Sequence, residues 1–145
     1  KLQPARLQTD GSYNAENGRV LVSVIARGMP LTRETVRAIP EAGENVWRRF
    51  RPGGTTDLNL FIEHTDSGGT QFKAEAFLDE ASFDFADAPF RLREVYGKLS
   101  VNEERVFLRD ITGELCGGPE PVEVNLNGAF DMEGRPDSFK VVFNK

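Results

Sequence analysis

The residues best suited to chemistry in this sequence are four carboxylates in the stretch LDEASFDFADAP: Asp79, Glu80, Asp84 and Asp87. Several oxygen ligands close together suit Ca²⁺, although the spacing is not that of an EF-hand loop. Two carboxylates flanking a bound sugar would instead suit a glycosidase. Strand alternation, however, turns such residues toward water. We therefore expect a solvated acidic turn, and a carbohydrate- or ester-acting β-domain that uses these carboxylates is the enzymatic alternative.

The histidine and the cysteine each occur once, which limits the chemistry open to them. His64 stands in IEHTDSGG beside a turn, where no second histidine can join it in a metal site. Cys116 stands in ELCGGPEP without an aligned base, and a single cysteine forms no intrachain disulfide. The glycine-rich stretches PGGTTD and CGGPEP match neither the P-loop nor the dinucleotide-binding pattern. We expect no catalytic residue, no metal and no cofactor.

The charge balance argues against a nucleic-acid partner. The sequence has 23 acidic and 18 basic residues, whereas a phosphate backbone favours clustered lysine and arginine. One basic cluster, Arg48, Arg49 and Arg51, suits the C-terminal end of a helix, where cations are favourable. A phosphate or lipid-headgroup contact is the alternative for that cluster. No window approaches the run of about 18 apolar residues that a membrane-spanning helix needs.

The elements that must position these residues are mostly strands. The segment RVLVSVIARG alternates with a period of two, and so do TDLNLFIEH and FKAEAFL, which the hairpin turn TDSGG connects. Each of the three segments has one apolar face, which in the first segment carries Val20, Val22, Val24 and Ala26. Further strand segments cover residues 81–85, 91–101, 105–108, 111–115, 122–130 and 138–143.

Between the first strand and the rest, the stretch LTRETVRAIPEAGENVWRRFRPGG predicts two short helices. Thr32 can serve as an N-cap. A full capping box is not expected, because Thr35, and not Glu or Gln, stands three residues after Thr32. Pro40 ends the first helix, and a second helix over residues 41–51 would turn Trp47 inward.

Together these signals predict a mainly β fold: a long antiparallel curved meander sheet with one or two short capping helices. Links this short make successive strands antiparallel neighbours, because a parallel crossover needs a dozen or more residues. We expect a single β-rich domain over residues 1–145, as a fragment of a longer chain. Linker sequence is expected only in the first dozen residues and the last two, with a turn-rich loop over residues 11–18.

A sheet with one apolar face needs something to cover that face, and two short helices are too small to cover it all. The sheet must therefore curl on itself, pack on a second layer, or leave an apolar trough open to a ligand or a neighbouring domain. Alternate positions on two adjacent strands are the candidates for lining such a trough. They are Leu58, Leu60, Ile62, Phe72, Ala74 and Ala76.

Read in order, several short elements resemble the repeated β-rich modules of AsmA/TamB-type proteins. A helical segment ending in W…P-x-G leads into a strand, a P-(F/Y)-x-(L/I)-x-x-(V/I)-x-G-x-(L/V) element follows, and later strands end on glycine. The resemblance covers about residues 32–143. The matching residues are Trp47, Pro52, Gly54, Asp57, Pro89, Phe90, Leu92, Val95, Gly97, Leu99, Gly113 and Gly128.

This resemblance implies a non-enzymatic module of a large, bridge-like lipid-transfer protein of the cell envelope. Its stacked sheets would form a groove for phospholipid acyl chains, and its partners would be those chains and neighbouring modules of the same polypeptide. The location implied is the periplasmic part of a protein anchored in the inner membrane. Envelope scaffolding, or a pure protein-interaction module that pairs through an exposed strand, stays open as an alternative.

Overall fold

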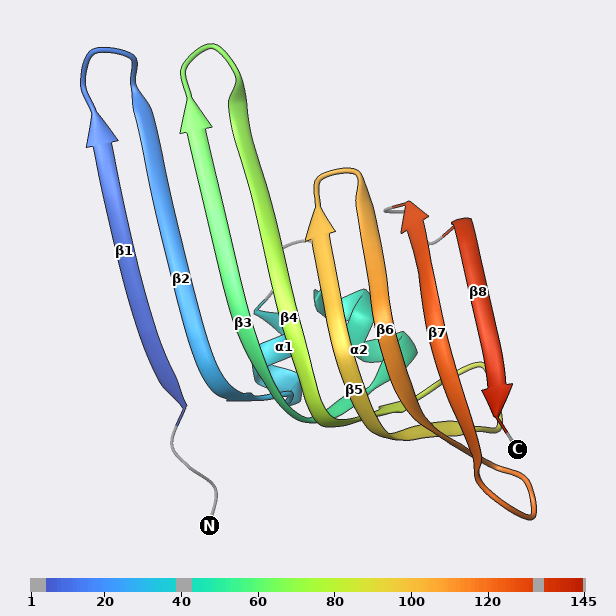
Figure 1. The fold of residues 1–145 in the computed structure, drawn as a ribbon. Coiled ribbons are helices and arrows are strands. Elements are labelled where there is room, and N and C mark those ends of the chain that lie inside the picture. Colours follow the sequence, from blue (N-terminus) through green and yellow to red (C-terminus); the bar gives the residue numbers. More distant parts are fainter. Residues whose placement is uncertain (1–4, 39–42, 132–134, 145) are drawn as a thin grey trace.

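The computed structural model describes residues 5–38, 43–131 and 135–144, and these form one eight-stranded antiparallel sheet with two short helices (Figure 1). Each strand pairs with its neighbours in the sequence, so the sheet is an open meander. The predicted mainly β fold is confirmed. The strands are β1 (Arg6–Asn14), β2 (Arg19–Pro30), β3 (Pro52–Thr65), β4 (Gly69–Asp84), β5 (Arg91–Asn102), β6 (Arg105–Cys116), β7 (Val122–Asp131) and β8 (Pro136–Asn144), and the helices between β2 and β3 are α1 (Arg33–Arg37) and α2 (Gly43–Phe50).

The alternating residues separate onto two different faces of this sheet. Leu60 pairs with Ala74 across β3 and β4, and Ala74 pairs in turn with Val101 on β5. We call the face that carries these side chains the apolar face. The opposite face carries Glu75 and its ion-pair partner Lys98, and we call it the polar face.

The strands bend near their lower ends in Figure 1, and a line of β-bulges accounts for the bend. In β4, β5 and β6 the sequences LDEA, LREV and LRDI each place two charged residues opposite one residue of a neighbouring strand. The second charged residue has a positive φ each time: 52° at Glu80, 48° at Glu94 and 49° at Asp110. A similar bulge in β2 contains Gly28, with a φ of 60°.

Two of these bulges are held by a polar side chain from the next strand. A bulge leaves a backbone N–H without its ladder partner. The N–H of Gly28 donates to Asp57 Oδ1 at 2.8 Å, and the N–H of Asp110 donates to Asn127 Oδ1 at 2.9 Å. Each acceptor residue stands opposite the bulge on the neighbouring strand. The bulges in β2 and β6 are therefore stabilised in the same way.

The core lies at this bend, on the apolar face. Ala81 and Val95 pair across β4 and β5 and are 0% exposed. The two residues of each bulge return the next apolar side chain to the same face of the sheet. In LDEA, LREV and LRDI the first and the last residue therefore both lie on the apolar face. The buried cluster consists of Leu78, Ala81, Leu92, Val95, Ile111 and Val124.

The two helices cover this bent end of the apolar face. The Phe50 ring of α2 packs edge-on against Phe85, with ring centroids 5.9 Å apart. The N–H of Ala86 donates to the Arg49 carbonyl at 2.9 Å, which fixes α2 to the segment after β4. Figure 1 shows both helices beside the lower part of the sheet, with the hairpins of β1 to β4 extending beyond them.

Helix α1 begins with a full capping box, contrary to the expectation from its sequence. The Thr35 N–H donates to the Thr32 hydroxyl at 3.3 Å, and the Thr32 N–H donates to the Thr35 hydroxyl at 2.9 Å. Threonine therefore takes the reciprocal role that is usual for Glu or Gln. The predicted helix end at Pro40 lies outside the described residues.

Three further expectations differ from the structure. Residues 6–14 are not a linker and loop but the edge strand β1, and only residues 15–18 form the turn. The segments 81–85 and 111–115 are not separate strands, because bulges join them to the strands before them. Trp47, which is expected to turn fully inward, is only half-buried.

Candidate functional site

The six predicted groove positions lie together on the apolar face of β3 and β4. None of them belongs to the buried core cluster, and all six side chains are half-buried. They meet in register as three cross-strand pairs: Leu58 with Ala76, Leu60 with Ala74, and Ile62 with Phe72.

Neighbouring strands extend this apolar surface on both sides. On β2, Val24 pairs with Leu60 and Val22 with Ile62. On β5, Leu99 pairs with Ala76, and the next strand adds Leu108 opposite Leu99. The apolar face is therefore continuous over at least five strands. Two alanines on β4, Ala74 and Ala76, stand between larger side chains on β3 and β5.

The edge strands carry the most exposed apolar side chains of that face. Leu7 and Tyr13 on β1 are 71% and 68% exposed, and Phe143 on β8 is 61% exposed. Leu7 pairs with Ala26, and Phe143 pairs with Val124, so these side chains lie on the apolar face. Among the described residues, β1 and β8 each pair on one side only, which leaves two open backbone edges.

The polar face is organised by ion pairs between adjacent strands. The Glu75 carboxylate accepts from Lys98 Nζ at 2.9 Å and lies 3.3 Å from Lys73 Nζ. The hydrogen bond from Lys98, together with Lys73, lowers the pKa of Glu75 below its ordinary value. Lys98 Nζ also lies 5.3 Å from the centre of the Phe77 ring, in a cation–π contact.

The predicted acidic turn does not gather into a site among the described residues. Asp79 and Glu80 form the β4 bulge, and Asp84 Oδ1 pairs with Arg91 Nε at 3.1 Å. Within residues 5–38, 43–131 and 135–144, no three His, Cys, Asp or Glu side chains come together as metal ligands would. His64 Nδ1 lies 2.8 Å from the Thr70 hydroxyl across the β3–β4 hairpin.

The basic cluster lies at the end of α2, where cations complement the helix dipole. Arg48 donates to Asn45 Oδ1 at 3.2 Å within the same helix. Arg49 supplies the carbonyl that receives the Ala86 N–H. At least two members of the cluster thus have structural contacts, and the alternative of a headgroup contact at this place is not needed to explain them.

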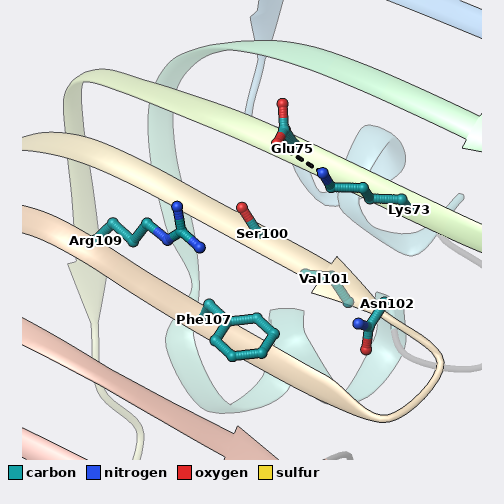
Figure 2. A pocket seen from close by; sticks show the side chains of 7 residues that line it. All are labelled: Lys73, Glu75, Ser100, Val101, Asn102, Phe107 and Arg109. Carbon is teal, nitrogen blue, oxygen red and sulfur yellow. Dashed lines mark ion pairs between the residues drawn. The ribbon is translucent and has the colours of Figure 1, made fainter.

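One hollow on the polar face was not predicted from the sequence. It has a volume of about 220 Å³ and lies over Ser100, the short residue at its floor (Figure 2). No motif marks it, because its residues come from three strands and meet only through the register. The lining consists of Lys73, Glu75, Ser100, Val101, Asn102, Phe107 and Arg109.

The fold and these surfaces define a class: an open, bent antiparallel sheet with one apolar face and helices at the bend only. No family model, curated protein or solved structure is significantly similar to this chain. Among the described residues, neither helix has the length and apolar character needed to cross a bilayer. Any function must therefore be argued from the surfaces themselves.

Proposed function

We propose that this chain is a non-enzymatic module of a larger cell-envelope protein, and that its apolar face holds phospholipid acyl chains for lipid transfer or envelope scaffolding. The observation that carries the proposal is the uncovered apolar surface around Leu60 and Ala74. These side chains stay partly exposed although they stand in the middle of an eight-stranded sheet. The reason is that the helices cover the apolar face only at the bend (Figure 1).

The energy available from one module is modest. A methylene removed from water contributes about 0.8 kcal/mol, so roughly ten methylenes lying on an open face, each about half-covered, contribute about 4 kcal/mol. That corresponds to a dissociation constant of about 1 mM. A single module would hold a lipid weakly and let it move on. Several modules in series would be needed for retention, which agrees with a place in a longer chain.

The proposed setting follows the AsmA/TamB resemblance. In that setting the chain is the periplasmic part of a protein anchored in the inner membrane, and its partners are phospholipid acyl chains and neighbouring modules. The carbohydrate- or ester-acting alternative has less support, because Asp84 is paired with Arg91 and the described carboxylates do not converge. The polar face, with its ion pairs between strands, would face water or protein.

The test places one charge on each face of β3. Leu60→Asp puts a carboxylate on the apolar face, and Phe61→Asp puts the same charge on the polar face at a side chain that is 44% exposed. Wild type and both variants are incubated with phospholipid and measured by native mass spectrometry, alongside thermal melts. We expect wild type and Phe61→Asp to carry lipid, and Leu60→Asp to lose it while staying folded.

Two results would contradict the proposal. If the wild type carries no lipid and Leu60→Asp only unfolds, then Leu60 belongs to an ordinary core. If Phe61→Asp loses lipid as completely as Leu60→Asp, then the bound lipid does not lie on the apolar face. A charge in a dry core costs several kcal/mol, so the melts separate these cases.

The open edges of the sheet favour a second candidate, a protein-interaction module that pairs edge to edge. An exposed edge strand is a template for another strand, and charges on an edge oppose such pairing. Light scattering after gel filtration over a range of concentrations measures the association. We expect the wild type to associate at high concentration and Phe143→Lys, on β8, to stay monomeric. A wild type that is monomeric throughout would remove this candidate.

A further inference from the structure

The hollow over Ser100 has the composition of an anion site. Two cations, Lys73 and Arg109, line it, and a third, Lys98, pairs with the Glu75 carboxylate that also lines it. Glu75 supplies the one negative charge of this group. The local charge is therefore positive in a chain whose formal net charge is −5. Such a local excess attracts anions.

Two of the donors in the hollow have no partner of their own. Among the described residues, neither the Ser100 hydroxyl nor the Arg109 guanidinium has a hydrogen-bond or ion-pair partner. Ser100 is only 7% exposed, and no buried side-chain oxygen of the described residues lacks a partner, so the hydroxyl must open into the hollow. Figure 2 shows the Arg109 side chain extending along the sheet toward Ser100.

The register of three strands builds the hollow. Glu75 pairs with Ser100, and Ser100 pairs with Phe107, so a short side chain stands between two long ones. The next cross-strand pair on the same face of β5 and β6 is Lys98 with Arg109. The Phe107 ring forms one wall (Figure 2). The Ser100 hydroxyl opens into the hollow, where water or a ligand can accept its hydrogen bond, and a ligand in this place would meet it together with the Arg109 guanidinium.

We propose that this hollow binds a phosphate group. A guanidinium can hold two oxygens of a phosphate at once, and the remaining oxygen is left for the Ser100 hydroxyl or the Lys73 ammonium. A carboxylate that places both oxygens on the guanidinium has no third oxygen to extend toward the Ser100 hydroxyl or the Lys73 ammonium. The hollow lies on the polar face, opposite the apolar face, so this site is independent of the acyl-chain groove. The phosphate is either free or part of a monoester, such as the headgroup of a lipid that ends in a phosphate.

The experiment follows backbone amides of the whole chain by ¹H–¹⁵N NMR while sodium phosphate replaces sodium chloride at constant ionic strength. We expect saturable shifts at Ser100, Asn102, Phe107 and Arg109. Arg109→Gln should weaken binding at least tenfold, since a charged hydrogen bond is lost. Ser100→Ala should weaken it about fivefold without lowering the melting temperature, because the hydroxyl has no partner within the described residues.

The control is Arg93→Gln, which removes the same charge from an exposed position of β5 outside the hollow. It should leave phosphate binding unchanged. Shifts that do not saturate, or an equal loss in Arg93→Gln, would overturn the site. A parallel titration with glycerol 3-phosphate separates the two sources: binding at least tenfold tighter than inorganic phosphate identifies a headgroup ester, and equal binding identifies free phosphate.

Discussion

Gly97 stands where the sheet bends, and replacing it tests whether the bend depends on a backbone without a side chain. Its φ is 134°, a conformation that L side chains rarely adopt. A Cβ built there would lie 2.7 Å from the Asp110 carbonyl oxygen and 2.8 Å from Ile111 Cα. Both belong to the β6 bulge and its immediate neighbour, so backbone would have to move to make room.

The cost of Gly97→Ala has two parts. The positive φ contributes about 1 to 2 kcal/mol, and overpacking against fixed backbone contributes about 1 to 3 kcal/mol. We therefore expect a loss of about 2 to 5 kcal/mol in the free energy of unfolding. Gly28→Ala is the matched control, because its φ is 60° but nothing lies within 4 Å of an added Cβ. It should cost only the conformational part, about 1 to 2 kcal/mol.

Urea unfolding followed by circular dichroism measures both variants against the wild type. A change in the midpoint at constant slope reports stability alone. For a chain of this size each kcal/mol corresponds to a shift of about 2 to 4 °C in the melting temperature. If Gly97→Ala costs no more than Gly28→Ala, then the close approach of β5 to the β6 bulge does not hold the bend, and the reasoning fails.

Two further predictions concern the cap and the polar face. Trp47→Ala should cost about 1 to 2 kcal/mol in urea unfolding, less than the 3 to 5 kcal/mol of a fully buried aromatic, because Trp47 is half-buried; an unchanged midpoint would remove its structural role, and Arg48→Ala on the same helix is the control. Hydrogen bonding to Lys98 lowers the folded-state pKa of Glu75 below its ordinary value of 4.5, so its stabilising contribution is present above about pH 4.5 and is lost as the pH falls through the lowered pKa. Unfolding midpoints of wild type and Glu75→Gln should therefore differ at neutral pH and converge in acid, and a difference that persists below the lowered pKa would contradict the assignment.

The apolar face could be predicted from the sequence because it depends on a period of two and on nothing else. Leu58, Leu60 and Ile62 alternate with polar residues, and the partner strand does the same, so the register follows from matching faces. Strand β1 was missed for the converse reason. Its sequence RLQTDGSYN has no apolar alternation, and it is a strand because the backbone of β2 offers it hydrogen bonds.

The bulges were missed although the sequence carries a signal for them. In LDEA, LREV and LRDI two charged residues interrupt the alternation. Around LDEA and LRDI this pattern predicts the end of one strand and the start of another, whereas LREV lies within the single strand predicted over residues 91–101. A continuous bulged strand has the same local sequence as two strands with a turn between them. What decides is the neighbouring strand, since Tyr96 faces the first pair and Asn127 faces the third. The hollow over Ser100 depends on the same cross-strand register, which single-strand patterns do not contain.

The bulges also explain how one sheet can hold both a sealed core and an open face. A regular strand would have placed Leu78 and Ala81 on opposite faces, because they are three residues apart. The extra residue at Glu80 returns Ala81 to the apolar face, where it is 0% exposed. The apolar face therefore continues without interruption from the uncovered part of β3 and β4 into the core at the bend. In the proposed function, an acyl chain lying on the apolar face of β3 and β4 would meet the two helices at the bent end of the sheet. The chain could therefore extend only away from the bend.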